Sequence, residues 1–182
     1  MFVSEIVPGM WVCDYEVINT TYFNNKNITL YIRCQGKEHF NARNNYNHKN
    51  IYIPNLSFSK TNDPYLRIQN KKIQENLYKD IRDIVPMIED NLIKMKNVVI
   101  YSKYGIQKAA TVACAYLLDI CNINVDAAIQ LMISKEPLFF QNPLQNIINT
   151  KNIKNQITQT NEINKNILVF YRTSLQLYYD YL

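Results

Sequence analysis

The sequence contains few of the residues that mark metal-binding and membrane-spanning proteins. It has two histidines, and its four cysteines show no CxxC spacing, so no zinc pattern can be recognised. No apolar run approaches the roughly 20 residues that a membrane span needs. The net charge of +5 is spread along the chain without an Arg-rich stripe, which argues against nucleic acid as a partner. We therefore expect no metal, no cofactor and no membrane span.

Cysteine usage also bears on the compartment in which the protein works. A chain of 182 residues buries roughly 70% of its unfolded surface, so it needs no disulfide to hold a core. We expect free and mostly buried thiols, as in a reducing environment. This predicts an intracellular protein with unpaired Cys13, Cys34, Cys114 and Cys121.

Glycine is scarce, with three residues, whereas the chain holds 25 Asn, 24 Ile and 14 Tyr. Asn, Ile, Lys and Tyr share A/T-rich codons, so this bias reflects genome composition, as in many large DNA viruses and some protists. Hydrophobic residues make up 47% and charged residues 19%, which excludes global disorder. The length fits one domain of ordinary size.

The hydrophobic pattern predicts alternating strands and helices. β-Branched and aromatic stretches predict strands at residues 8–13, 28–34, 50–56 and 97–101, with loops at 36–49 and 57–70. Apolar spacings of three and four predict helices at residues 72–96, 106–120 and 125–134, and a further one around 141–150. Pro86 should kink the first of these helices or break it in two. We expect an α/β fold with a mostly parallel or mixed central sheet of four to five strands flanked by helices.

The C-terminal region divides into two parts by composition. Residues 151–166 are polar and are interpreted as a linker, whereas residues 167–182 are strongly apolar. Helical spacing and strand alternation fit the apolar segment about equally well. Because such a segment would aggregate if it were exposed, it should pack on its own domain or dock on another chain. We expect an interaction segment that docks on a second copy or on a different protein.

A loop at residues 102–108 joins the apolar strand at 97–101 to the buried helix at 106–120. Loop amides and a helix N-terminus in this arrangement bind phosphate groups. The candidate phosphate-binding residues are Ser102, Lys103, Tyr104, Gly105, Ile106, Gln107 and Lys108. One glycine alone is weak evidence, so the surrounding residues decide.

The stretch VVIYSKYGIQKAATVACAYLL resembles the active-site region of dual-specificity protein phosphatases. In that family an apolar strand precedes His-Cys-x-x-Gly-x-x-Arg-Ser-x-Thr, and an apolar helix with Ala-Tyr-Leu follows. The chain keeps the strand, Gly105, Thr111 and the run from Ala115 to Leu117. IVPGMWVCDYEVIN is similar to the family's opening strand, and VDAAIQLMISKEPLFFQNP to its helix after the loop. The resemblance implies a phosphatase-like domain at residues 1–150.

The residues that carry the family's chemistry differ in this chain. The nucleophilic Cys corresponds to Ser102 and the phosphate-clamping Arg to Lys108. The His before the nucleophile corresponds to Tyr101, and the Ser or Thr after the Arg to Ala109. A serine hydroxyl stays protonated where a thiol ionises, and Lys lacks the planar fork that holds two oxygens. We therefore expect no catalytic residues at these degenerate positions.

The position of the family's general acid has no clear equivalent either. The family spacing lands near Lys71, which is not a carboxylate. Asp63 can serve only if its loop is longer here, and an Asn-Asp-Pro turn explains that residue better.

Three functions remain open at this point. The domain can be an inactive binding module that holds a phosphorylated side chain, although Lys108 grips less well than Arg and Tyr104 can fill the pocket. It can be a scaffold or assembly protein, like the compact phosphatases of poxviruses and other large DNA viruses that are packaged in virions. It would then lie in the host cytoplasm or the virion. The third alternative is a weakly active phosphatase on phosphoprotein or RNA 5′-phosphate with rearranged residues.

Overall fold

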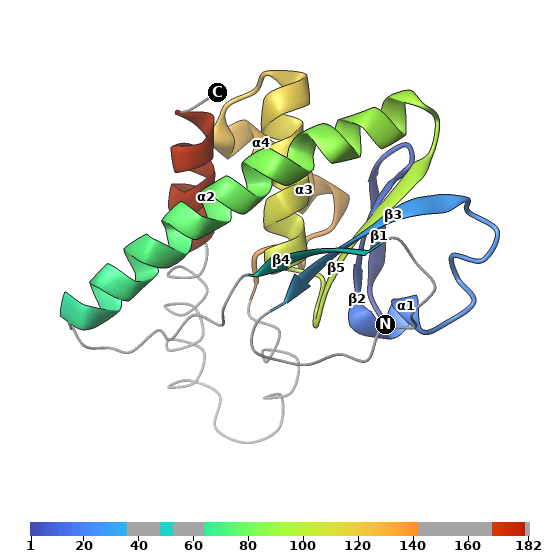
Figure 1. Ribbon diagram of the computed structural model, residues 1–182, viewed down its shortest axis with the longest axis horizontal. Helices are drawn as coiled ribbons and strands as arrows, with labels where there is room; N and C mark the ends of the chain where they lie inside the picture. Colours follow the sequence, from blue (N-terminus) through green and yellow to red (C-terminus); the bar gives the residue numbers. More distant parts are fainter. Residues whose placement is uncertain (36–47, 53–63, 142–168, 181–182) are drawn as a thin grey trace.

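Five strands form one mixed sheet in the computed structural model, which describes residues 1–35, 48–52, 64–141 and 169–180 (Figure 1). The strands are β1 (Val3–Val7), β2 (Met10–Asp14), β3 (Ile28–Gln35), β4 (His48–Tyr52) and β5 (Asn97–Ser102). Their order across the sheet is β1-β2-β5-β3-β4. β1 runs antiparallel to β2, and the other neighbours are parallel. The expected α/β fold with a mixed sheet is confirmed.

β5 is the central strand, and its last five residues are buried. A near-continuous apolar run of this kind is typical of a parallel strand covered on both faces. The register places Asp14 of β2 beside Ser102 of β5, and Arg33 of β3 beside Tyr101. The carboxyl ends of these three strands therefore meet at one edge of the sheet, where the candidate loop begins.

The helices cover the two faces of the sheet unequally (Figure 1). α2 (Pro64–Ile93), α3 (Lys108–Cys121), α4 (Val125–Lys135) and a C-terminal helix at residues 169–179 share the large core with one face. The short α1 (Tyr15–Ile18) belongs to a smaller core on the other face. α3 has ten consecutive buried residues, as its all-round apolar sequence predicts. None of the helices in the described ranges combines the length and hydropathy needed to cross a membrane.

α2 begins and ends earlier than the helix expected at residues 72–96, and it is continuous through its middle. It begins at Pro64, so residues 64–70, expected in a loop, are helical. Proline suits the first turn of a helix because its missing N–H would have no partner there. Of the kink or break expected at Pro86, the break is wrong, since the helix continues to Ile93. Pro86 lies on the exposed face between buried Val85 and Ile88, so water can solvate the carbonyl that the proline leaves free.

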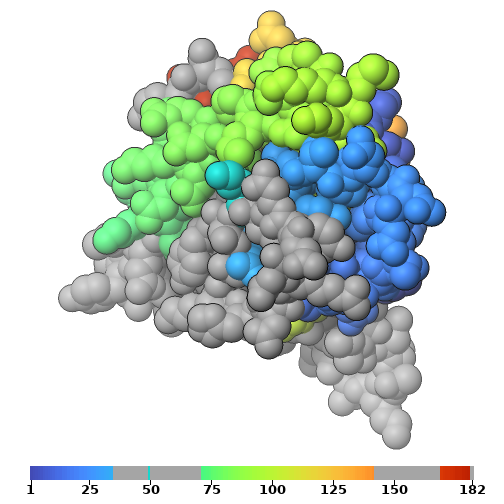
Figure 2. Space-filling view, turned by 45° about the vertical axis from the view of Figure 1, so that its right-hand side comes forward, coloured from blue at the N-terminus to red at the C-terminus, as the bar shows by residue number. Residues whose placement is uncertain are grey.

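The remaining predicted elements agree to within a few residues. The strand expected at residues 50–56 is observed at 48–52, and β1 and α1 were not predicted. The C-terminal part of α2 lies against the segment that enters β3 (Figure 2), where the Thr29 hydroxyl donates to Asn91 Oδ1 at 2.8 Å. The helix expected around 141–150 and the linker at 151–166 lie outside the described residues.

The C-terminal helix packs on its own domain. Its four buried apolar side chains Phe170, Tyr171, Leu175 and Tyr178 lie on one helical face and belong to the large core. Figure 1 shows this helix, in red, beside α2 and α4. The open choice between helix and strand is therefore resolved as helix. These four side chains fill an apolar surface that α2, α3 and α4 present within the same chain, and docking of the segment on a second chain stays a prediction.

The cysteines are free, as expected, and three are buried. Burial raises the pKa of the Cys34 and Cys114 thiols well above the usual value. Cys121 at the end of α3 is exposed.

Candidate functional site

The predicted strand, loop and helix are present in the expected order. β5 ends at Ser102, the loop follows, and α3 begins at Lys108. Ser102 is only 5% exposed although it is polar. The loop leaves the central strand at the carboxyl edge of the sheet, which is where ligands bind in parallel α/β folds.

Gly105 makes the turn that brings the loop back over Ser102. Its φ of +74° lies in the left-handed region, and its N–H donates to Ser102 Oγ at 3.1 Å. A Cβ here would lie 2.6 Å from Phe2 Cδ1, 2.7 Å from the Cys13 carbonyl carbon and 2.9 Å from the Asp14 nitrogen. Both the backbone angle and the close approach to β2 therefore require glycine.

The N-terminus of α3 begins with Gln107, whose side chain does not cap the helix. The first helical bond runs from the Thr111 N–H to the Gln107 carbonyl at 2.8 Å. The earlier N–H groups of a helix have no acceptor within it, and they carry the positive end of the helix dipole. This end of α3 adjoins Ser102, so the loop has the electrostatics of an anion-binding site.

Ser102 is the residue that the sequence resemblance assigns to the position of the nucleophile. Its register partner on β2 is Asp14, a residue that was not predicted for the site. Asp14 instead caps α1: Oδ1 accepts from the Val17 N–H at 3.0 Å, and Oδ2 accepts from the Phe2 N–H at 2.5 Å. The Asp14 carboxylate is thereby oriented toward backbone amides. The Asp-Tyr-Glu-Val sequence is a signal for an N-cap, but it does not indicate that Asp14 lies beside Ser102.

Tyr101, which the sequence resemblance assigns to the position of the family's His, does not share the space of Ser102. Neighbouring residues of a strand point to opposite faces, and Tyr101 is fully buried in the smaller core. Burial raises the pKa of its phenol well above the usual value, and the nearby charge of Arg33 opposes that increase. The centroids of the Tyr101 and Tyr15 rings lie 6.3 Å apart. Tyr101 therefore has a packing environment and not that of a proton carrier.

The two lysines of the loop lie in different surroundings. The Lys103 ammonium lies 5.3 Å from the centroid of the Tyr104 ring, and Tyr104 is 43% exposed. The Tyr104 ring is therefore at the surface and does not fill the loop. Lys108 lies close enough to Cys34 of β3 for its charge to act on that thiol. Burial raises the pKa of Cys34, and the Lys108 charge lowers it by a smaller amount.

The other predicted positions are distributed as follows. Ala109 is fully buried in the first turn of α3. Ile106 is buried, and its carbonyl accepts from the Phe140 N–H at 2.7 Å. Lys71, where the family spacing places the general acid, is an exposed residue of α2. Asp63 lies outside the described residues.

Comparison with known proteins gives the class of this fold. The family model for the dual specificity phosphatase catalytic domain matches residues 10–162, so the match runs past residue 150. No curated protein sequence matches the chain. The arrangement of a central parallel strand, a glycine loop and a buried helix is thus that of the cysteine-dependent phosphatases. The chain belongs to the dual specificity phosphatase family.

Solved structures support the fold over nearly the whole chain. Human DUSP28 is similar with a TM-score of 0.64 and 14% identity, over 98% of this chain and 93% of that one. A leucine-rich-repeat and phosphatase-domain protein of Entamoeba histolytica gives 0.62 and 15%, over 99% and 92%. The human tyrosine phosphatase-like serine/threonine/tyrosine-interacting protein gives 0.62 and 11%, over 97% and 94%. Alignments this long include most of the C-terminal helix, so it lies within the shared fold.

Proposed function

We propose that the protein is a catalytically inactive member of its family that acts as a binding or scaffold module for a phosphorylated protein. The observation that carries the proposal is that Ser102 is buried and accepts a hydrogen bond from the Gly105 N–H. The sequence resemblance assigns this serine to the position of the family's nucleophilic cysteine.

Chemistry at Ser102 would require a base. A serine hydroxyl ionises far above neutral pH and attacks only when a neighbouring group takes its proton. Asp14 is the carboxylate beside it in the sheet, and both Asp14 oxygens accept backbone N–H groups. Lys108 and Ala109 replace the clamp and the residue that helps the leaving group. Losses at several steps of one mechanism reduce the rate by many powers of ten.

Binding requires less than catalysis. The N-terminus of α3, the Gly105 turn and the charges of Lys103 and Lys108 supply the donors and positive potential that a phosphate group needs. With serine in place of cysteine, a bound phosphoester stays intact. A structural neighbour carries the name tyrosine phosphatase-like serine/threonine/tyrosine-interacting protein, which is consistent with this use of the fold.

The partner is accordingly a phosphoprotein, in an intracellular or virion setting where the cysteines stay reduced. The free thiols and the A/T-biased composition support that setting. A scaffold role in viral assembly would use the same surface.

Calorimetric titration of the whole chain with a phosphotyrosine peptide and its unphosphorylated counterpart tests the proposal. We expect binding of the phosphorylated peptide alone, weakened about tenfold by Lys108→Ala because a charge-assisted contact is lost. Lys94→Ala is the control, since Lys94 follows the C-terminal end of α2 and pairs there with Asp90. Equal affinity for both peptides would contradict the binding site, and turnover of the phosphopeptide that Ser102→Ala abolishes would contradict inactivity.

A further inference from the structure

The candidate loop is held from outside by a short segment that follows α4. The Phe140 N–H donates to the Ile106 carbonyl at 2.7 Å, and Gln107 Nε2 donates to the Gln141 carbonyl at 2.6 Å. Two consecutive residues of the loop are thus tied to two consecutive residues of this segment.

The first of these bonds orients a peptide group of the loop. In a planar trans peptide the carbonyl and the following N–H point in opposite directions. Phe140 fixes the direction of the Ile106 carbonyl, so the Gln107 N–H must point away from the Phe140 segment. A phosphate-binding loop depends on such an orientation, because a reversed peptide would present an oxygen where it needs a donor.

Phe140 adopts an uncommon backbone conformation to make this contact. Its φ of +64° lies in the left-handed region, which bulky residues rarely occupy. Such a conformation persists only where the surrounding structure holds it in place. The Phe140 side chain is 3% exposed, so its packing must supply that support.

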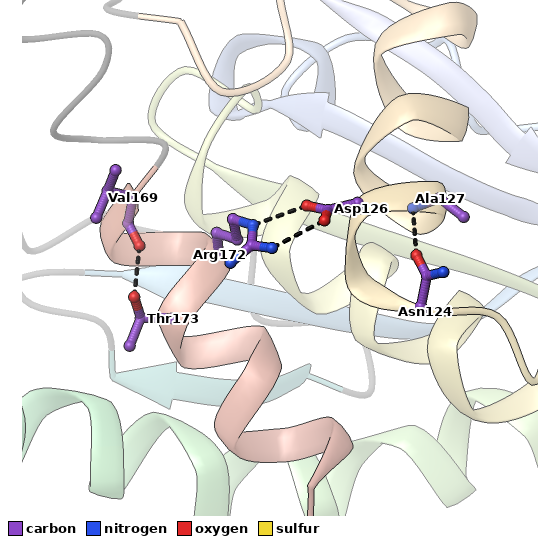
Figure 3. A network of polar contacts seen from close by, with 6 residues as sticks. All are labelled: Asn124, Asp126, Ala127, Val169, Arg172 and Thr173. Carbon is purple, nitrogen blue, oxygen red and sulfur yellow. Dashed lines mark hydrogen bonds and ion pairs between the residues drawn. The ribbon is translucent and has the colours of Figure 1, made fainter.

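The support comes in part from the C-terminal helix. The centroids of the Phe140 and Tyr171 rings lie 6.3 Å apart. Burial raises the pKa of the Tyr171 phenol, and the nearby Cys34 of β3 raises it further. The helix is anchored to α4 by the Arg172–Asp126 ion pair (Figure 3). A continuous series of contacts therefore joins the C-terminal helix, through Tyr171 and Phe140, to the loop.

We propose that docking of the C-terminal helix regulates the candidate loop through the Tyr171–Phe140 contact. With the helix docked, Phe140 holds the Ile106 carbonyl and the loop keeps its donor orientation. A partner that captures the helix would release Phe140 and weaken phosphate binding, and bound phosphate would favour the docked helix by the same factor. The effect on ligand affinity rests on the proposed function, whereas the effect on loop conformation does not.

Amide hydrogen exchange by NMR on the full chain tests this coupling. The reporters are the amides of Gly105 and Phe140, whose acceptors are Ser102 Oγ and the Ile106 carbonyl. Tyr171→Ala is compared with Tyr178→Ala, because both tyrosines are buried on the same helix but Tyr178 contacts Tyr78 and Asp119 instead of Phe140. We expect exchange at both reporters to be about tenfold faster in Tyr171→Ala than in Tyr178→Ala. A tenfold change in the equilibrium for local opening of the loop is of the size that the loss of a local contact produces.

A second variant covers the case in which Tyr171→Ala does not fold. Phe140→Gly removes the ring but keeps the N–H and tolerates the positive φ, and it should speed exchange of the Gly105 amide by a similar factor. Titration with inorganic phosphate then adds a separate readout, with weaker binding expected in Tyr171→Ala than in Tyr178→Ala. Equal exchange in the two tyrosine variants, or no effect of Phe140→Gly, would overturn the coupling. Absence of phosphate binding by the wild type would overturn the proposed function, and the exchange rates would still decide the coupling.

Discussion

Arg172 and Asp126 form a two-point ion pair between the C-terminal helix and α4, with Nε–Oδ1 at 2.7 Å and Nη2–Oδ2 at 2.8 Å (Figure 3). The planar guanidinium suits this paired geometry. Asp126 also lies in the first turn of α4, where the helix dipole favours a negative charge. The pair joins residues 46 positions apart in the sequence.

Replacement of Asp126 should change stability in a pH-dependent way. The hydrogen bond from Arg172 lowers the pKa of the Asp126 carboxyl. A lowered folded-state pKa contributes stability above the unfolded value of about 3.9, and that contribution is lost as the pH falls through the folded value. Asp126→Asn should therefore lower the melting temperature slightly at neutral pH, and the difference from wild type should shrink in acid. Arg172→Gln and the double variant should show the same small loss as Asp126→Asn alone, and additive losses would mean that the two groups act separately.

Leu175→Ala should destabilise the whole domain. Leu175 is fully buried in the large core, so its truncation leaves a cavity and should cost about 2–5 kcal/mol in urea unfolding. Val169→Ala on the same helix is the control, because Val169 is 53% exposed and its loss should stay within about 0.5 kcal/mol. A Leu175→Ala protein with unchanged stability but a smaller oligomeric mass by light scattering would show that the helix docks on another chain.

Gly105→Ala should distort the loop more than Gly9→Ala distorts the hairpin between β1 and β2. Both glycines have positive φ, so each variant carries backbone strain. At Gly105 the new Cβ also meets backbone atoms of β2, whereas at Gly9 its two nearest contacts are side-chain atoms that can move. We expect a loss of about 2–4 kcal/mol at Gly105 and about half of that at Gly9, measured by chemical denaturation. Equal losses would indicate that the loop can retreat from β2.

Ser102→Cys should not restore phosphatase activity by itself. The new thiol would gain the Gly105 N–H and the end of α3, but Lys108, Tyr101 and Ala109 would remain unchanged. Hydrolysis of a generic aryl phosphate should stay at the level of a buffer blank for both wild type and variant. Robust turnover by the single variant would mean that the nucleophile alone limits this site. Adding Lys108→Arg tests whether the clamp is the next missing part.

The sequence identified the local units of this protein. The apolar run of β5, the glycine turn and the all-round apolar α3 follow from residue type and spacing over short distances, so the amino-acid pattern alone predicts them. Ser102 and Lys108 could be assigned in the same way, because the motif places them at set distances from Gly105. Asp14 could not, because it reaches Ser102 only through the pairing of β2 with β5.

Other features depended on contacts between distant parts of the chain. The apolar spacing of residues 167–182 fitted a helix and a strand about equally, and the surface of α3 and α4 selected the helix by burying Phe170, Leu175 and Tyr178. The same packing keeps α2 continuous past Pro86, where local propensity predicts a break. The positive φ of Phe140 has no signature in the sequence, since contacts with the Ile106 carbonyl and the Tyr171 ring stabilise it. Local sequence determines which elements can form, and burial against partners far along the chain decides which of them does.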